Sequence, residues 1–105
     1  MTQDSDRVYI SVLLDTYGSL LTDKQREISR IHYDMDVSLG EIAAEYDISR
    51  QAVRDCLLKA EDALRSYEDA LGMVKLKQNI HNIAVNAENS NPIAALKKIA
   101  ELTEI

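Results

Sequence analysis

A short segment of the chain carries polar side chains of the kinds that contact nucleic acid: Ser49, Arg50, Gln51, Arg54 and Lys59. Arginine can donate two parallel hydrogen bonds to the edge of guanine, and glutamine can pair with the edge of adenine. If a helix begins at Ser49, the next three of these side chains point outward together with Asp55. The free amides of its first turn can then meet a phosphate. The pattern predicts a nucleic-acid interface on this helix, with Lys59 extending its basic face.

Other reactive side chains are isolated from one another. His32 and His81 fall on separate predicted helices, with no further histidine or cysteine at metal-ligand spacing. Asp34 and Asp36 are interpreted as the end of a helix rather than a metal site, because no third oxygen ligand is near. Cys56 adjoins an apolar position, which favours burial over reactivity. Since the sequence has no nucleophile elbow, phosphate loop or pair of catalytic acids, we expect no enzyme, no metal and no cofactor.

The segment SLGEIAAEYDISRQAVRD, residues 38–55, has the pattern of two short helices joined by a tight turn. Ser38 followed by Glu41 is a capping box, which predicts a helix over Leu39–Tyr46, and Ser49 caps the helix that follows. Apolar residues placed as hydrophobic staples flank both helix starts: Val37, Ile42, Ile48 and Val53. These helix caps and hydrophobic staples predict a helix-turn-helix motif.

Such a motif needs a close helix crossing and a sharp turn. Ala43 offers a small side chain where the two helices should touch. Asp47 occupies the turn position that requires a left-handed conformation, which glycine adopts most easily and aspartate at modest cost. The alternative is that two capped helices simply pack in a small helical domain and contact no nucleic acid.

Two more helices are predicted before this motif. The first segment, from about residue 5 to residue 21, has apolar residues at steps of three and four, which predicts an amphipathic helix that ends near Gly18. These residues are Val8, Val12, Leu13, Tyr17, Leu20 and Leu21. Thr22 and Gln25 form a capping box for the second helix, which extends to about Met35. Its buried residues are expected to be Ile28, Ile31 and Met35.

The helix that begins at Ser49 is predicted to be long. Its apolar seam alternates steps of four and three: Val53, Leu57, Ala60, Leu64, Tyr67, Leu71 and Val74. We expect Gly72 to kink the helix, after which the rhythm continues on a shifted face as far as Ala87. A helix of about 28 residues is roughly 42 Å long, more than a small motif covers. Either the first and last helices or a second copy must cover the seam, and we favour a homodimer.

A final helix is expected after the segment Asn89-Ser90-Asn91-Pro92, with Asn91 as the N-cap and Pro92 at the first helical position. It runs from Ile93 to about Leu102. No strand pattern is present, so the expected fold is all-α. Residues 1–71 should form a helix-turn-helix domain that includes the first part of the long helix. Residues 72–105 should form a helical extension that packs on this domain or on a second copy.

The charge of the chain opposes tight nucleic-acid binding, because its formal net charge is −6. Residues 49–79 hold six basic and five acidic side chains and are the only non-acidic part. Phosphate contacts supply most non-specific affinity, and few are available here. Four carboxylates also crowd the approach to the predicted interface: Asp34, Asp36, Glu41 and Glu45. A second interpretation is therefore an adaptor that binds a basic partner through this acidic surface.

The composition is typical of a globular protein, with 46% hydrophobic and 29% charged residues. One cysteine cannot form an internal disulfide, and the segment MTQDSDRV has no apolar signal core. No stretch approaches the roughly 20 apolar residues that a membrane span needs. We expect a cytoplasmic protein without a membrane span.

The combination of LLTDKQREISRIHY with SLGEIAAEYDISRQAV resembles region 4 of sigma factors, and more closely the YlxM family of small bacterial proteins. Members of that family are usually encoded beside the protein subunit of the signal recognition particle. The resemblance implies a sigma-region-4-like helix-turn-helix protein with an accessory or regulatory role in the signal recognition particle pathway. Its implied partners are components of that particle, or DNA or RNA. The expected DNA-facing positions match Ser49, Arg50, Gln51 and Arg54. Asp47 departs from the glycine that is more frequent there.

Overall fold

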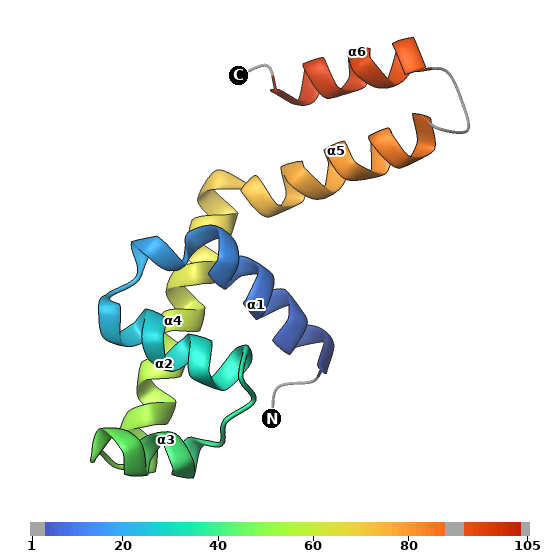
Figure 1. Cartoon of the computed structure of the whole chain (residues 1–105). Helices are drawn as coiled ribbons and strands as arrows, with labels where there is room; N and C mark the ends of the chain where they lie inside the picture. Colours follow the sequence, from blue (N-terminus) through green and yellow to red (C-terminus); the bar gives the residue numbers. More distant parts are fainter. Residues whose placement is uncertain (1–3, 88–91, 104–105) are drawn as a thin grey trace. The chain divides into compact units, whose positions relative to one another are not determined.

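The computed structural model describes residues 4–87 and 92–103 (Figure 1). The described residues form six α-helices and one 3₁₀ turn: α1 (Asp4–Tyr17), η1 (Gly18–Leu20), α2 (Asp23–Tyr33), α3 (Leu39–Tyr46), α4 (Arg50–Leu71), α5 (Met73–Ala87) and α6 (Pro92–Thr103). No strand occurs among them, so the all-α prediction is confirmed. The chain divides into two compact units, Met1–Leu71 and Gly72–Ile105, which are described separately below.

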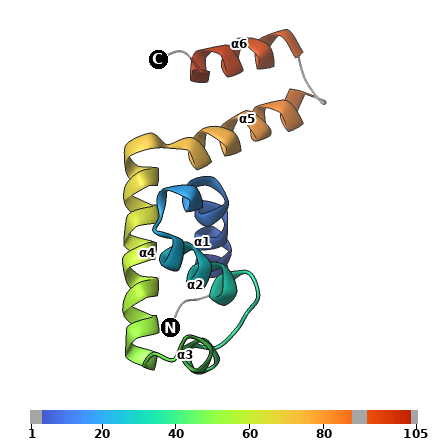
Figure 2. The same ribbon diagram turned by 60° about the vertical axis from the view of Figure 1, so that its left-hand side comes forward.

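In the first unit, α1, α2 and α3 all pack against α4 (Figure 2). The side of α4 that they cover carries one apolar stripe, which is fully or almost fully buried: Val53, Leu57, Ala60 and Leu64. This stripe is the first part of the predicted seam. It belongs to the core of the chain's own first unit, so these four side chains are not available to a second copy.

The buried face of α1 agrees with the predicted one only in part. The structure buries Leu13, Tyr17 and Leu21, as predicted, together with Ile10 and Leu14. Val8 and Leu20 remain 64% and 53% exposed, and Val12 is also exposed. Both sets of residues have helical spacing, so the pattern alone could not select between them. The positions of α2 and α4 decide which stripe faces the core.

The start of α2 is as predicted, but its end is not. The Gln25 N–H donates to Thr22 Oγ1, and the Thr22 N–H donates to Gln25 Oε1, both at 3.2 Å, which completes the capping box. Ile28 is fully buried. The helix ends at Tyr33, so Met35 lies beyond its regular period and is 68% exposed. The prediction that Met35 is buried was therefore wrong.

The predicted continuous helix of about 28 residues is interrupted, because α4 ends at Leu71 after 22 residues. Gly72 adopts the left-handed conformation with φ 62°, which a residue without a Cβ reaches at little cost. The Leu76 N–H then donates to the Gly72 carbonyl and opens a new helix, α5. Gly72 thus separates two helices, where the sequence suggested a kink in one.

The second unit contains α5 and α6, which pack against each other and run in opposite directions (Figure 1). Apart from Val74, none of its described side chains is buried, and Val85, Ile93 and Leu96 are exposed. The predicted N-cap Asn91 lies outside the described residues, and α6 begins at Pro92. No helix in the described ranges is both long and apolar enough to cross a membrane.

Polar contacts join α1 to the end of α2. Arg30 Nη1 lies 2.8 Å from Asp15 Oδ1 and 2.9 Å from Asp34 Oδ2, and the Ser11 hydroxyl donates to Asp34 Oδ1. Partial burial raises the pKa of Asp34, but the hydrogen bonds from Ser11 and Arg30 and the charge of Arg30 outweigh it. The pKa of Asp34 is therefore lowered. A lowered carboxyl pKa means that the ionised form stabilises the folded state.

We predict that this contribution to stability is present at neutral pH and is lost in acid. The pKa of an unfolded aspartate is about 3.9, so the stabilisation holds above roughly pH 4 and disappears as the pH falls through the lower folded value. Thermal unfolding should show Asp34→Asn less stable than the wild type at pH 7, with a difference that shrinks below pH 4. Asp69→Asn, at an exposed site on α4, is the control. A difference that does not change with pH would contradict the prediction.

Candidate nucleic-acid interface

Serine caps begin the two helices of the motif. The Glu41 N–H donates to Ser38 Oγ at 3.1 Å, and the Ala52 N–H donates to Ser49 Oγ at 3.0 Å. Among the described residues Glu41 forms no return bond to Ser38, so the predicted capping box is present only in half. Both caps place polar backbone groups of a helix start near the surface.

The turn between α3 and α4 has the predicted left-handed residue. Asp47 has φ 53° and ψ 48° and ends α3, and its N–H donates to Ala44 O. Below the turn lies a cluster of five buried residues: Ile28, Ile42, Ala43, Val53 and Leu57. The staple residues Val37 and Ile48 pack against this cluster, as their spacing predicts. The helix-turn-helix geometry therefore rests on a shared core of α2, α3 and α4.

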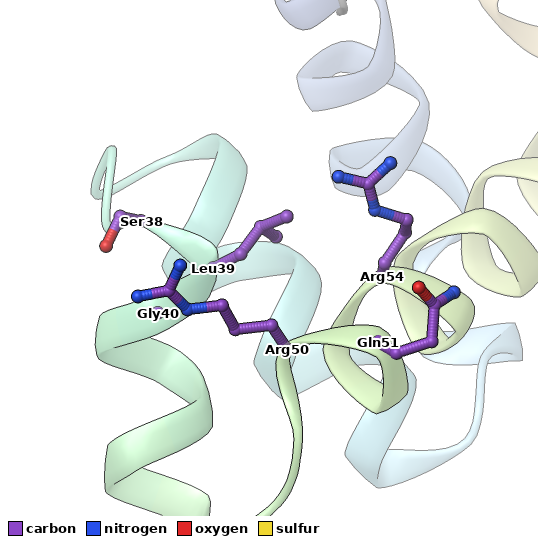
Figure 3. Close-up of a pocket in the computed structure, with 6 residues that line it drawn as sticks. All are labelled: Ser38, Leu39, Gly40, Arg50, Gln51 and Arg54. Atoms are coloured by element: carbon purple, nitrogen blue, oxygen red, sulfur yellow. The ribbon is translucent and has the colours of Figure 1, made fainter.

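The starts of α3 and α4 together form a surface hollow of about 460 Å³ (Figure 3). Its lining residues come from both helix starts: Ser38, Leu39, Gly40, Arg50, Gln51 and Arg54. Three of the five predicted site residues are thus brought together by the structure. No acidic side chain is among these lining residues, whereas Arg50 and Arg54 are both basic.

Arg50 reaches across the first turn of α3. A Cβ atom at Gly40 would lie 3.0 Å from Arg50 Nη2 and 3.1 Å from its Nε, so the absence of a side chain at Gly40 leaves room for the guanidinium. Gly40 was not among the predicted site residues. Its contribution depends on the crossing of two helices, which the local sequence does not reveal.

Arg50 and Arg54 differ from the other four arginines of the chain. Arg7, Arg26, Arg30 and Arg65 each form an ion pair with a carboxylate. Within the described part of the chain, Arg50 and Arg54 form neither an ion pair nor a side-chain hydrogen bond. The two arginines that lack a partner among the described residues therefore lie about one helical turn apart on α4 and line one hollow.

Gln51 is held by its neighbour one turn along α4. Its Nε2 donates to Asp55 Oδ1 at 2.9 Å. Residues four positions apart face each other on a helix, so the spacing of Gln51 and Asp55 could have predicted this pair. Asp55 was expected to point outward but was not included in the predicted site.

Ser49 and Lys59 do not line the hollow. The Ser49 hydroxyl accepts the Ala52 N–H and serves the start of α4. Burial raises the pKa of the Cys56 thiol, and the positive charges of Lys24 and Lys59 oppose this rise. Lys59 follows Arg54 by five residues, about 140° around a helix of 3.6 residues per turn, so the two side chains leave α4 on different sides. Its predicted part in nucleic-acid binding would have to be a separate contact.

The four carboxylates that crowd this region in the sequence have different surroundings. Arg30 pairs with Asp34, and Arg7 pairs with Asp36 at 2.9 Å. Glu41 and Glu45 are exposed on α3 and form no ion pair with the described residues. Ion pairs within the chain thus compensate the charge of only two of these four carboxylates, Asp34 and Asp36. No group of three or more histidine, cysteine, aspartate or glutamate side chains in the described ranges is arranged to hold a metal.

The family UPF0122, described as "Putative helix-turn-helix protein, YlxM / p13 like", matches residues 4–105. The chain belongs to this family. A UPF0122 protein of Thermoanaerobacter sp. strain X514 is 52% identical over 79 residues, which are 75% of this chain and 68% of the relative. One from Caldanaerobacter subterraneus subsp. tengcongensis is 52% identical over 77 residues, 73% of this chain and 66% of the relative. One from Clostridium kluyveri is 45% identical over 75 residues, 71% of this chain and 68% of the relative.

These matches confirm the resemblance to the YlxM family. They also fit the structure, since the two helices and the left-handed turn form the helix-turn-helix that the family description names. The matched relatives extend beyond the aligned part, which spans about two thirds of their length.

We predict that Asp47→Gly is neutral or stabilises the protein by up to about 1 kcal/mol. Glycine relieves the Cβ strain of the left-handed conformation, and its larger unfolded-state entropy offsets part of this gain. Chemical denaturation measures the change. Asp36→Gly is a matched comparison, because Asp36 has φ 57° but also pairs with Arg7, so its gain should be smaller. A clear loss of stability in Asp47→Gly would show that the aspartate side chain itself supports the turn.

Proposed function

We propose that this protein is a cytoplasmic helix-turn-helix accessory or regulatory protein that acts by binding rather than by catalysis, and that α4 contacts nucleic acid weakly or with assistance. The observation that carries the proposal is that Arg50 and Arg54 line one hollow and have no partner within the described fold. The fold uses its other arginines in ion pairs. Two cations on one surface without intramolecular partners are suited to an external anion.

Within this hollow the side chains suit different parts of a nucleic acid. Arg50 lies over the start of α3, where the free backbone amides of the first helical turn also favour an anion, so we assign it to a phosphate. Gln51 and Arg54 follow on the exposed side of α4 and are suited to base edges. Ser49 supports this arrangement through its cap. Lys59 would add a phosphate contact on the other side of α4.

The proposed binding is weak because the first unit is strongly acidic. Residues 1–71 contain eight basic and fifteen acidic side chains, a formal charge of −7. Few phosphate contacts against such a charge leave little non-specific affinity at physiological salt. We expect dissociation constants in the micromolar range or weaker for the isolated protein, since non-specific binding typically lies at about 10⁻⁴–10⁻⁶ M. A partner that supplies positive charge would strengthen the contact.

A role in the signal recognition particle pathway is implied by the resemblance to the YlxM family, because members of that family are usually encoded beside the protein subunit of the particle. The particle combines a protein with an RNA, so it could offer a phosphate backbone to the arginines and a basic protein surface to the carboxylates. Its RNA could meet the unpaired arginines, and a basic protein surface could meet Glu41 and Glu45. We propose signal recognition particle components as partners, with DNA or RNA as the nucleic acid.

The second unit supports a homodimer. Residues 72–105 contain four basic and three acidic side chains, so two copies of this unit meet without the repulsion expected between two copies of the first unit. The hairpin of α5 and α6 leaves Val85, Ile93 and Leu96 exposed. Pairing two such hairpins would make a four-helix bundle and cover apolar surface. A dimer would also present two copies of the hollow, which raises avidity without new contacts.

We predict that Leu96→Asp weakens this dimer, because it places a charge on an apolar face that is 67% exposed in one chain. Sedimentation equilibrium over a range of protein concentrations should show the wild type as a dimer and the variant shifted to monomer. Leu20→Asp, at a 53% exposed leucine of the first unit, is the control and should remain dimeric. A wild-type protein that stays monomeric at every concentration would contradict the proposal.

An adaptor without direct nucleic-acid contact is the second candidate. It is favoured by the formal charge of −7 on the first unit and by the unpaired carboxylates Glu41 and Glu45 on α3. Such a protein would keep the helix-turn-helix as a scaffold and bind a basic partner. Its affinity would then depend on Glu41 and Glu45 and not on Arg50 and Arg54.

We predict that Arg50→Ala and Arg54→Ala each weaken nucleic-acid binding by about 1 kcal/mol or more. Fluorescence anisotropy with a labelled DNA duplex and with an RNA hairpin, at several salt concentrations, measures both affinity and its salt dependence. Loss of a phosphate contact at Arg50 should reduce the slope of log K against log salt by about 0.9. Arg26→Ala removes the same charge from an exposed ion pair on α2 and is the matched control. If both arginine variants bind as the wild type does, the adaptor function is favoured.

A further inference from the structure

The hydrogen bond between Gln51 and Asp55 gives the proposed interface an acceptor beside its donors. The amide nitrogen of Gln51 is engaged at 2.9 Å by Asp55 Oδ1. This leaves the second carboxylate oxygen of Asp55 on the exposed side of α4 as a group that can only accept, while Gln51 keeps its Oε1 acceptor and one Nε2–H donor. Arg54 lies between them in sequence and forms no ion pair with Asp55. The carboxylate is therefore not neutralised by the arginine next to it.

A carboxylate on a protein surface that binds nucleic acid weakens the binding. It repels phosphates and so lowers affinity for every sequence. An acceptor is useful only where the ligand presents a donor. In the major groove of duplex DNA the donors are the exocyclic amino groups of adenine and cytosine, whereas guanine and thymine present acceptors.

We propose that the Gln51–Asp55 pair is a specificity element that accepts a hydrogen bond from the amino group of adenine or cytosine in the major groove of duplex DNA. This inference rests on the proposed nucleic-acid function and names its substrate class. Duplex RNA is disfavoured, because its deep and narrow major groove does not admit side chains to the base edges.

The neighbouring residues then divide the contacts. Arg54 carries only donors and suits the acceptors of guanine, while the Asp55 carboxylate, held by Gln51, carries only acceptors. A guanine or thymine opposite the Asp55 carboxylate would bring two acceptors together and leave both without a hydrogen bond. Asp55 thus gives up affinity for all sequences and gains selectivity against two of the four bases, which is a recognised way to build specificity.

Asp55→Asn tests this division, because an asparagine can donate as well as accept and has no charge. The probe is a library of DNA duplexes with a randomised central segment, bound to the full-length protein at low salt and sequenced after selection. We expect the wild type to prefer adenine or cytosine at one position by about tenfold, which corresponds to 1.4 kcal/mol. Asp55→Asn should lose this preference and bind the unselected library more tightly.

Asp62→Asn is the matched control, since it removes one negative charge from an exposed position further along α4. It should raise affinity for the library without changing the base preference. Circular dichroism establishes that both variants are folded.

The outcomes separate this inference from the function on which it rests. If Asp55→Asn keeps the base preference of the wild type, or if the wild type binds the library without any preference, the specificity element is refuted while nucleic-acid binding stands. If the wild type does not bind, or if Arg50→Ala and Arg54→Ala leave binding unchanged, both proposals fail.

Discussion

Burial of the apolar stripe on α4 is the constraint on which the rest of the first unit depends. Val53 and Leu64 are fully buried, and α1, α2 and α3 all pack on this helix. Burial of a large aliphatic side chain contributes about 1.5–3 kcal/mol, so the stripe sets the rotation of α4 about its axis. With that rotation set, Gln51 and Arg54 must face outward, and Arg50 must lie against the first turn of α3. The candidate interface is thus a consequence of core packing.

The distribution of ion pairs gives this acidic protein a surface that can meet an anion. Arg7 and Arg30 join α1 to the end of α2 through Asp15, Asp34 and Asp36. These pairs are partly exposed and contribute modestly to stability, yet they remove cations and carboxylates together from the available surface. Among the described residues, Arg50 and Arg54 at the hollow remain without an ion pair. Glu41 and Glu45 on α3 and Asp55 on α4 also remain without one.

Gly72 places the proposed nucleic-acid contact and the proposed dimer contact on different helices. Its left-handed conformation ends α4 at Leu71, so the helix that carries the candidate interface is not the helix that would hold two copies together. The first unit has a substantial core, whereas the second is a hairpin of two helices with exposed Ile93 and Leu96. A single helix pair has little means to bury its own apolar residues, which is why we infer that a second copy completes it.

Signals that act over a few residues were readable from the sequence. The caps at Thr22, Ser38 and Ser49 and the left-handed Asp47 depend on atoms within about one helical turn, so their residue types and spacing were sufficient. The spacing of Gln51 and Asp55 carried the same kind of local information, although the predicted site did not include Asp55. The helix-turn-helix and three of the hollow's lining residues follow from such signals.

Contacts between distant residues were decided by the tertiary structure alone. Two stripes of α1 had helical spacing, and only the packing of α2 and α4 selected Ile10 and Leu14 over Val8 and Val12. In the same way, a sequence with six arginines does not state which of them will meet a carboxylate. Arg30 on α2 pairs with Asp15 on α1, and the guanidinium of Arg50 lies next to Gly40 on α3. Residue types and local spacing determine which side chains can bind a ligand. The fold decides which remain available, because each long-range pairing depends on where the core has placed the helices.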